Sequence, residues 1–204
     1  MSNQDIHEVL LIIADISGYT KFMVSDDVEV KHSQHIISEL IHTIIRQVEI
    51  PLEVSKLEGD AVFLYAKKES DTFTWDYIRK TTGEKLIRFF DAFHNKLQEL
   101  TTHRSCGCGA CSNLHELSLK VVAHSGEALF YNIHDFKELS GKDVILVHRL
   151  LKNSINTDEY LLMTQQAYED VEFPDLLATE EGKESYSHLG PVTTYVYKPE
   201  SRLS

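Results

Sequence analysis

The sequence predicts a domain that combines helices with a β-sheet, and three stretches near its start carry this prediction. Residues 9–14 form an apolar run that ends at an aspartate with a glycine soon after, which is typical of a buried strand meeting a turn. Between residues 37 and 48, isoleucine, leucine and valine recur at spacings of three and four, which indicates an amphipathic helix. Residues 52–66 contain two strand-like runs around Gly59-Asp60, which indicates a hairpin.

Composition limits the class of protein. The chain has 204 residues, enough for one domain with a full core. Its net charge of −12 argues against a nucleic-acid surface and against binding to an anionic membrane. No apolar run approaches the roughly 20 residues of a membrane helix, and the first residues lack a signal-peptide pattern. We therefore expect a single cytoplasmic domain over residues 1–204.

The aspartate that ends the first strand, Asp15, needs a partner, because strands rarely bury a lone carboxylate. One explanation is that Asp15 caps the segment that follows it. The other starts from residues 61–66, a nearly all-apolar strand expected beside the first one in the middle of the sheet. Asp15 and Asp60 would then lie close together and repel one another unless a divalent cation lies between them. The alternative for Asp60 is that it is simply a turn residue.

The remaining elements follow from local patterns. An aromatic-rich apolar stripe within residues 71–102 predicts a helix, and we assign the stripe to the core. Residues 117–131 are expected to form two strands around His124-Ser125-Gly126. A helix is expected to open at Gly141. The chain should then end with a short strand at 161–163, a helical turn and a hairpin around Gly190-Pro191.

A cysteine- and histidine-rich insertion is expected at about residues 103–115. It contains a Cys-x-Cys-x-x-Cys motif with a histidine on either side, comprising His103, Cys106, Cys108, Cys111 and His115. Zn²⁺ takes four such ligands in a tetrahedron, so the three cysteines and either histidine could hold one zinc ion. Because three thiolates and an imidazole close the coordination shell, the role would be structural. The alternative is a flexible loop of free thiols.

Two motifs resemble those of the class III adenylate and guanylate cyclases. Ala-Asp-Ile-Ser-Gly-Tyr-Thr at 14–20 resembles their first metal motif, and Lys-Leu-Glu-Gly-Asp-Ala at 56–61 resembles their second. The resemblance extends over roughly residues 9–66 and 117–198, including a His-Ser-Gly hairpin at 124–126. It implies an α+β fold with a ferredoxin-like βαββαβ palm core, in which helices flank a central antiparallel sheet.

The resemblance also implies roles for individual residues. Asp15 and Asp60 would hold two Mg²⁺ or Mn²⁺ ions, with the backbone carbonyl of Ile16 as a further ligand. Lys56 would contact the purine. The family's other purine-reading residue, an Asp in adenylate cyclases, stands three positions before the helix-opening glycine, where this chain has Glu138. A lysine and a carboxylate can donate to and accept from the adenine edge, so this pair favours ATP.

The chain departs from the family pattern at two places. Arg149 matches the family's arginine, which stabilises charge on the phosphates, but Ile145 stands where the family has an asparagine that orients the ribose. The closing hairpin lacks the family's lysine or arginine for the triphosphate, and His188 is the nearest candidate. These departures make the active site of a cyclase incomplete.

Three functions are therefore left open. The first is a homodimeric nucleotide cyclase that converts ATP to 3′,5′-cyclic AMP and pyrophosphate, with Arg149 supplied by the partner chain. The second is a nucleotide-binding or regulatory module of the same fold that has lost turnover, which the two departures favour. The third is a zinc-stapled interaction domain in which the palm is only a scaffold, which the retained aspartate pair disfavours. The sequence names no regulator or pathway.

Overall fold

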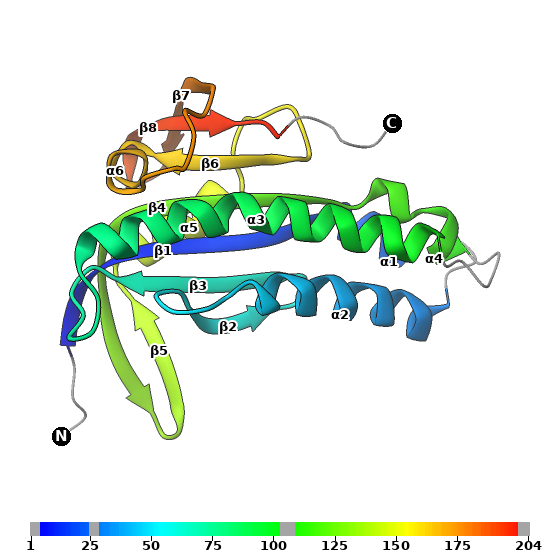
Figure 1. Ribbon diagram of the computed structural model, residues 1–204, viewed down its shortest axis with the longest axis horizontal. Helices are drawn as coiled ribbons and strands as arrows, with labels where there is room; N and C mark the ends of the chain where they lie inside the picture. Colours follow the sequence, from blue (N-terminus) through cyan, green and yellow to red (C-terminus); the bar gives the residue numbers. More distant parts are fainter. Residues whose placement is uncertain (1–4, 25–28, 103–108, 200–204) are drawn as a thin grey trace.

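An eight-stranded sheet runs through the part of the chain that the computed structural model describes, which is residues 5–24, 29–102 and 109–199 (Figure 1). The strands are β1 (Asp5–Ser17), β2 (Glu53–Glu58), β3 (Ala61–Lys67), β4 (Ser118–Ile133), β5 (Phe136–Ser140), β6 (Tyr160–Thr164), β7 (Thr179–Tyr186) and β8 (Gly190–Tyr197). The helices are α1 (Tyr19–Val24), α2 (Val30–Arg46), α3 (Trp75–Thr102), α4 (Gly109–Ser112), α5 (Lys142–Leu150) and α6 (Gln165–Asp170), with a 3-10 turn η1 (Leu114–Glu116). In this part of the chain, none of the helices has the length and apolar character needed to span a membrane.

The strand order is β2-β3-β1-β4-β6-β8-β7, with β5 paired to β4. The segment β1-α2-β2-β3-α3-β4 forms the palm, because its four strands lie in the order β4-β1-β3-β2 and pair antiparallel throughout. The pairing of β4 with β6 is parallel, so the whole sheet is mostly rather than wholly antiparallel. The α+β palm fold implied by the sequence is confirmed.

Strand β1 lies between β3 and β4 and is buried on both faces. Its even-numbered residues Leu10, Ile12 and Ala14 belong to one core cluster, and its odd-numbered residues belong to the other. A strand buried on both faces needs apolar side chains at every position, which explains the unbroken apolar run. The predicted first strand and the predicted β2-β3 hairpin are both confirmed.

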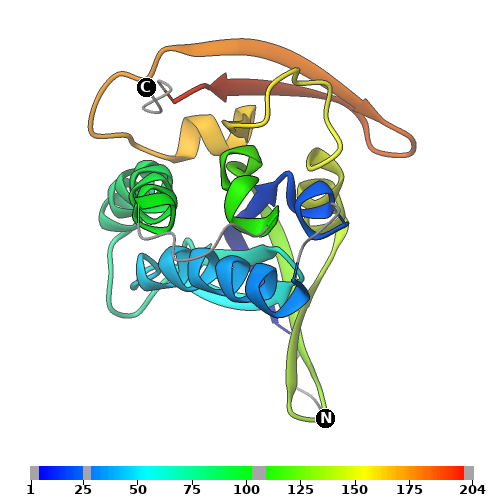
Figure 2. The same cartoon turned by 90° about the vertical axis from the view of Figure 1, so that its right-hand side faces the viewer.

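Helices cover the two faces unequally. The long helices α2 and α3 lie side by side on one face (Figure 2). The aromatic stripe Phe89, Phe90 and Phe93 of α3 is buried there as predicted. On the opposite face, α5 buries Val144 and Val147 against β1 and β4. Helix α5 has only nine residues and so leaves part of this face for polar side chains.

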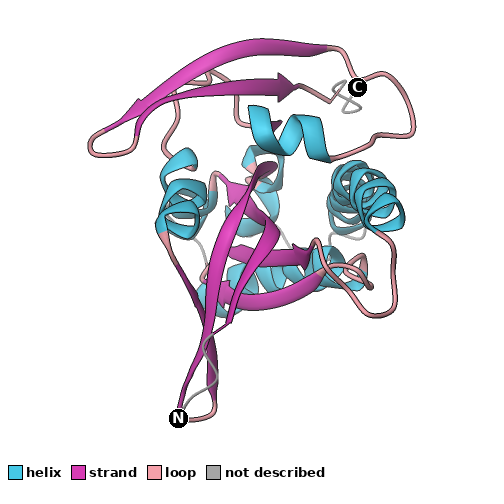
Figure 3. Ribbon diagram, turned by 90° about the vertical axis from the view of Figure 1, so that its left-hand side faces the viewer, coloured by secondary structure: helices cyan, strands magenta, loops and turns pink. Residues whose placement is uncertain are grey.

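The prediction of two strands around His124-Ser125-Gly126 is wrong. Strand β4 is continuous from Ser118 to Ile133, and it turns back into β5 only after Ile133, so that this hairpin extends beyond the body of the molecule (Figure 3). The glycine at 126 serves close packing instead of a turn. A Cβ atom built there would lie 2.4 Å from Oδ2 of Asp143, a buried carboxylate in the first turn of α5. That same oxygen accepts the backbone N–H of Glu127 at 2.8 Å.

Candidate functional site

The polar residues singled out by the two cyclase-like motifs share the sheet face opposite α2 and α3. Asp15 has the same parity on β1 as Ile13, which belongs to the cluster beneath α5. On β2, Lys56 and Glu58 lie opposite Phe63 and Ala61 of β3, which belong to the same cluster. The sheet therefore brings together side chains that come from motifs about 40 residues apart.

The two aspartates lie where β1 meets the β2-β3 turn. The backbone N–H of Ile16 donates to the carbonyl of Asp60 at 3.2 Å, which fixes the turn against the end of β1. Burial raises the pKa of Asp60, and the charge of Asp15 raises it further. Because this pKa is raised, ionised Asp60 weakens the folded state at neutral pH, and the fold gains stability as the pH falls through that value. A bound cation would relieve the same repulsion.

A lysine that the sequence did not point to lies beside this pair. Lys120 on β4 is the cross-strand partner of Asp15, and its Nζ lies 2.8 Å from Asp15 Oδ2. Burial opposes the charge on Lys120, but the hydrogen bond and charge of Asp15 outweigh burial and raise the pKa of the ammonium group. The partner of Asp15 is therefore an ammonium group, and the capping alternative is not needed to explain its burial. No local pattern marks Lys120, because its role depends on the β1-β4 register.

The donor set suits a hard divalent cation. Two carboxylates and the carbonyl of Ile16 offer only oxygen atoms, which Mg²⁺ and Mn²⁺ prefer. Among the residues that the structure describes, however, no cluster of three or more His, Cys, Asp or Glu side chains is placed to hold a metal ion. The aspartate pair therefore fits a cation whose remaining ligands come from a bound molecule or water.

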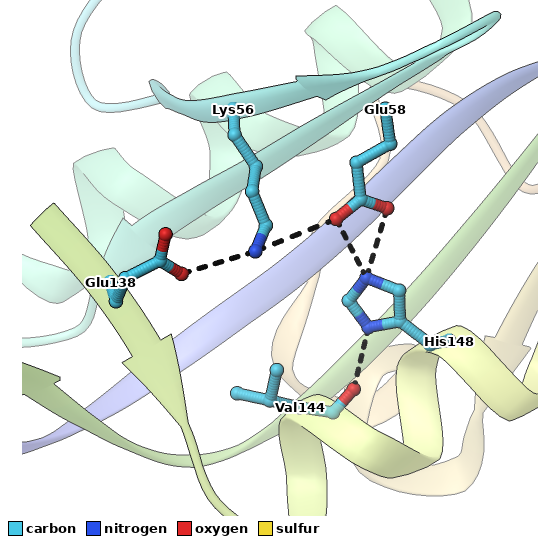
Figure 4. Close-up of polar contacts among 5 residues, drawn as sticks. All are labelled: Lys56, Glu58, Glu138, Val144 and His148. Atoms are coloured by element: carbon cyan, nitrogen blue, oxygen red, sulfur yellow. Dashed lines mark hydrogen bonds and ion pairs between the residues drawn. The ribbon is translucent and has the colours of Figure 1, made fainter. Parts of the chain in front are cut away.

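The predicted purine-reading pair is brought together by the fold. Nζ of Lys56 on β2 lies 3.1 Å from Oε2 of Glu138 on β5 (Figure 4). Burial opposes the charge of Lys56, but its hydrogen bond to Glu138 and the nearby carboxylates raise its pKa overall. Both side chains keep roughly a third of their surface exposed, at 40% and 30%, so a ligand can reach them.

Two further residues join this pair and were missed by sequence reasoning. Glu58 Oε1 lies 3.7 Å from Lys56 Nζ, and the ring nitrogen Nε2 of His148 lies 3.1 and 3.2 Å from the two oxygens of Glu58 (Figure 4). Strand alternation would have placed Glu58 beside Lys56, since the two are separated by one residue. No local signal identifies His148, because its position depends on how α5 docks on the sheet.

The other residues on α5 lie as the sequence predicted. Ile145 and Arg149 are exposed one helical turn apart, with 55% of Ile145 exposed.

Two histidines that the sequence analysis named lie away from α5. His124 on β4 is buried, and its Nδ1 lies 2.9 Å from Thr164 Oγ1. Burial lowers the pKa of His124, in keeping with a structural role. His188 is exposed in the β7-β8 turn.

The structure describes only part of the proposed zinc set, because His103, Cys106 and Cys108 lie outside the described residues. Cys111 is buried in α4, and its Sγ lies 3.9 Å from Nε2 of His32 on α2. His115 instead places its Nδ1 3.0 Å from the carbonyl of Ser112. His32, a histidine that the sequence analysis had not included in the set, therefore lies beside the described thiol.

Comparison with known proteins gives one sequence family. A family model described as a protein of unknown function, DUF2652, matches residues 37–160. The chain belongs to this family. The chain is 31% identical over 128 residues to the uncharacterized protein Rv2561/Rv2562 of Mycobacterium tuberculosis. The match covers 63% of this chain and 57% of that protein, so the chain spans little more than half the length of its relative.

Solved structures with the same fold include nucleotide cyclases. The guanylyl cyclase Cya2 is 12% identical with a TM-score of 0.77, covering 100% of this chain and 98% of its own. The adenylyl cyclase CyaB from P. aeruginosa is 13% identical with a TM-score of 0.73, covering 98% of each chain. A dimeric guanylyl cyclase domain from the fungus Blastocladiella emersonii is 13% identical with a TM-score of 0.63, covering 97% of each. At such low sequence identities, the likeness shows that this DUF2652 protein has the cyclase fold. It does not show which activity the protein has.

Replacing Lys120 tests the charge balance of the aspartate pair. Lys120→Met keeps the aliphatic stem but leaves two half-buried carboxylates without their ammonium partner. We expect the free energy of unfolding at pH 7 to fall by about 1–3 kcal/mol, and the loss to shrink at lower pH, where protonated Asp60 needs no counter-charge. Urea denaturation at several pH values measures both effects.

The matched control is Lys198→Met, which breaks an exposed ion pair of 2.7 Å to Glu180. That change should cost less than about 1 kcal/mol. A Lys120→Met variant as stable as the control at every pH would show that the aspartates do not depend on Lys120.

Proposed function

We propose that this DUF2652 protein binds a nucleoside triphosphate together with divalent cations, with ATP preferred. The observation that carries the proposal is that two pairs of side chains lie on one sheet face. Asp15 and Asp60 offer oxygen ligands that suit the metal ions of a triphosphate. Lys56 and Glu138 offer a donor and an acceptor that suit a purine edge. The cyclase fold of the solved neighbours supports the same assignment.

Asp15, Asp60 and the carbonyl of Ile16 would hold Mg²⁺ or Mn²⁺, with phosphate oxygens completing the coordination. When bound, such cations neutralise phosphate charge and polarise phosphoryl oxygens. Lys120 lies beside the pair and is the described cation best placed to contact the triphosphate, a role for which the closing hairpin offers only His188. Lys120 would then exchange part of its interaction with Asp15 for one with phosphate.

The base would contact Lys56 and Glu138. The Watson–Crick edge of adenine presents an acceptor at N1 next to a donor at N6, whereas guanine presents a donor at N1 next to an acceptor at O6. A lysine donates and a carboxylate accepts, so the positions of the two groups decide which base fits. The replacement of the family's Asp by Glu138 lengthens one of these groups and makes the preference for ATP a mild one.

Turnover to 3′,5′-cyclic AMP and pyrophosphate is proposed as a slow secondary activity. In that reaction the ribose 3′-oxygen bonds to the α-phosphorus, the bond to the pyrophosphate oxygen breaks, and the hydroxyl proton leaves to solvent. Ile145 cannot donate a hydrogen bond where the cyclases have an asparagine, and losing one such donor typically costs about 10²–10³ in rate. Binding should therefore survive better than conversion. A binding module without turnover is the second candidate, favoured by the exposed, apolar Ile145.

Asp60→Asn tests the metal-dependent binding. The variant should weaken Mn²⁺-dependent ATP binding at least about tenfold, because one of two carboxylate ligands is lost. It should lose no stability, since ionised Asp60 weakens the fold at neutral pH. Calorimetric titration with ATP or GTP in MnCl₂ measures binding, and chromatography of the same mixtures detects any cyclic product.

Asp135→Asn, at the exposed β4-β5 turn, is the matched control for loss of one negative charge. Equal ATP binding by wild type, Asp60→Asn and this control would contradict the two-metal assignment. If wild type binds ATP yet forms no cyclic product, the proposal of a binding module is supported and the proposal of cyclase activity is contradicted. If wild type binds neither ATP nor GTP, nucleotide binding is contradicted and the alternative of a zinc-stapled interaction domain is supported.

A symmetric homodimer is part of the proposal: Arg149 is exposed on α5, and the resemblance to the class III cyclases implies that it completes the site of the partner chain. Light scattering at tens of micromolar should give about twice the chain mass. This is the range in which a weak dimer of about −6 to −8 kcal/mol assembles. A monomer at these concentrations, with and without ATP and Mn²⁺, would contradict shared sites.

A structural zinc ion is proposed for the cysteine-rich insertion. The separation of 3.9 Å between Cys111 Sγ and His32 Nε2 is close to that of two ligands on one tetrahedral Zn²⁺, about 3.5 Å from typical bond lengths. This makes His32 a candidate beside His103 and His115. Elemental analysis of protein purified without added metal should find about one zinc per chain. Absence of zinc, with three freely titratable thiols, would remove the site.

A further inference from the structure

Four side chains of alternating charge connect β5, β2 and α5. They run from Glu138 through Lys56 and Glu58 to His148 (Figure 4). Glu138 and Lys56 are the proposed base-reading pair, whereas Glu58 and His148 have no role in the function proposed above. Their contacts raise the question of what they do for Lys56.

Both ring nitrogens of His148 face hydrogen-bond acceptors. Its Nδ1 lies 2.8 Å from the carbonyl oxygen of Val144, and its Nε2 lies within 3.2 Å of both oxygens of Glu58. A carbonyl and a carboxylate only accept hydrogen bonds, so both ring nitrogens must donate, which requires the imidazolium form. The ring is also held by an edge-on contact with Phe63, with centroids 4.9 Å apart.

The imidazolium form of His148 affects which of two carboxylates, Glu58 or Glu138, holds the ammonium group of Lys56. The ammonium lies 3.1 Å from Glu138 and 3.7 Å from Glu58, so two carboxylates compete for it. His148 satisfies both oxygens of Glu58 and weakens its pull on Lys56. Without this partner, Glu58 would attract the lysine as strongly as Glu138 does.

We propose that Glu58 and His148 are positioning residues that hold Lys56 beside Glu138 and thereby set the base preference of the site. The inference rests on the proposed function, in which Lys56 and Glu138 read the purine. Adenine and guanine present donor and acceptor in opposite order, so a lysine fixed on one side of Glu138 selects one base. A lysine that moves to Glu58 loses that selectivity.

The test uses 3′-deoxy-ATP and 3′-deoxy-GTP, which lack the attacking hydroxyl and cannot be cyclised. Their dissociation constants in MnCl₂ are measured for wild type, His148→Gln, Glu58→Gln and the double variant. His148→Gln should weaken binding of 3′-deoxy-ATP about tenfold and leave 3′-deoxy-GTP little changed. The double variant should recover most of the lost preference, because Glu58→Gln removes the competing charge.

The rescue separates positioning from structural damage, since loss of packing around His148 would not be repaired at Glu58. The matched control is Glu53→Gln, which removes the same charge from the same strand at a carboxylate that accepts a hydrogen bond from Tyr65. It should leave the ratio of the two affinities unchanged. If His148→Gln does not fold, Glu58→Gln alone decides: it should bind 3′-deoxy-ATP as tightly as wild type or more tightly, and weaker binding overturns the inference.

Crystal structures of wild type and His148→Gln provide a measurement that needs no nucleotide. In the variant, Nζ of Lys56 should lie nearer Glu58 than Glu138. An unmoved lysine, or one affinity ratio shared by all variants, overturns the positioning role even if wild type binds ATP. If wild type binds neither nucleotide but the lysine moves as expected, the proposed function fails while the electrostatic coupling of His148 to Lys56 stands.

Discussion

The pairing register of β1 is the constraint on which the site depends. Because β1 is hydrogen-bonded on both sides and buried on both faces, its register with β3 and β4 is strongly specified. That register sets Asp15 opposite Lys120 on one side and opposite Ala61 on the other. A slip of one residue would turn Asp15 into the core beneath α2 and α3. The same packing that makes β1 the centre of the fold therefore places the charges of the site.

The two charged clusters on this face differ in net charge. Asp15, Asp60 and Lys120 leave one negative charge in excess, which attracts a cation more than it attracts a bare phosphate. The cluster of Glu138, Lys56, Glu58 and His148 is balanced in the imidazolium form that we infer for His148, so its groups are available for directional hydrogen bonds without a strong field. In a chain of net charge −12, this division suits the ligand proposed above, a triphosphate that arrives with its metal ion and presents a neutral base to the second cluster.

Local signals predicted the elements that carry their own pattern. The apolar run of β1, the hairpin at Gly59-Asp60 and the aromatic stripe of α3 all lie as expected, because each depends on residues close in sequence. Lys120 and His148 could not be found in this way, since the first depends on strand register and the second on helix docking. The segment 124–126 was misread as the turn between two strands because a glycine needed for close packing looks the same in sequence as one needed for a turn.

The contact between Gly126 and Asp143 restricts how the family can vary. A Cβ atom at 126 would lie 2.8 Å from the Cβ of Asp143 as well as 2.4 Å from its Oδ2, so shortening Asp143 to alanine does not make room. No single replacement at 126 is tolerated while α5 stays where it is, and moving α5 displaces His148 and Arg149. Sequence drift is thereby directed away from this contact and toward the exposed side of α5. On α5 we therefore expect replacements to be tolerated first at the exposed positions 145 and 149, with the glycine unaltered.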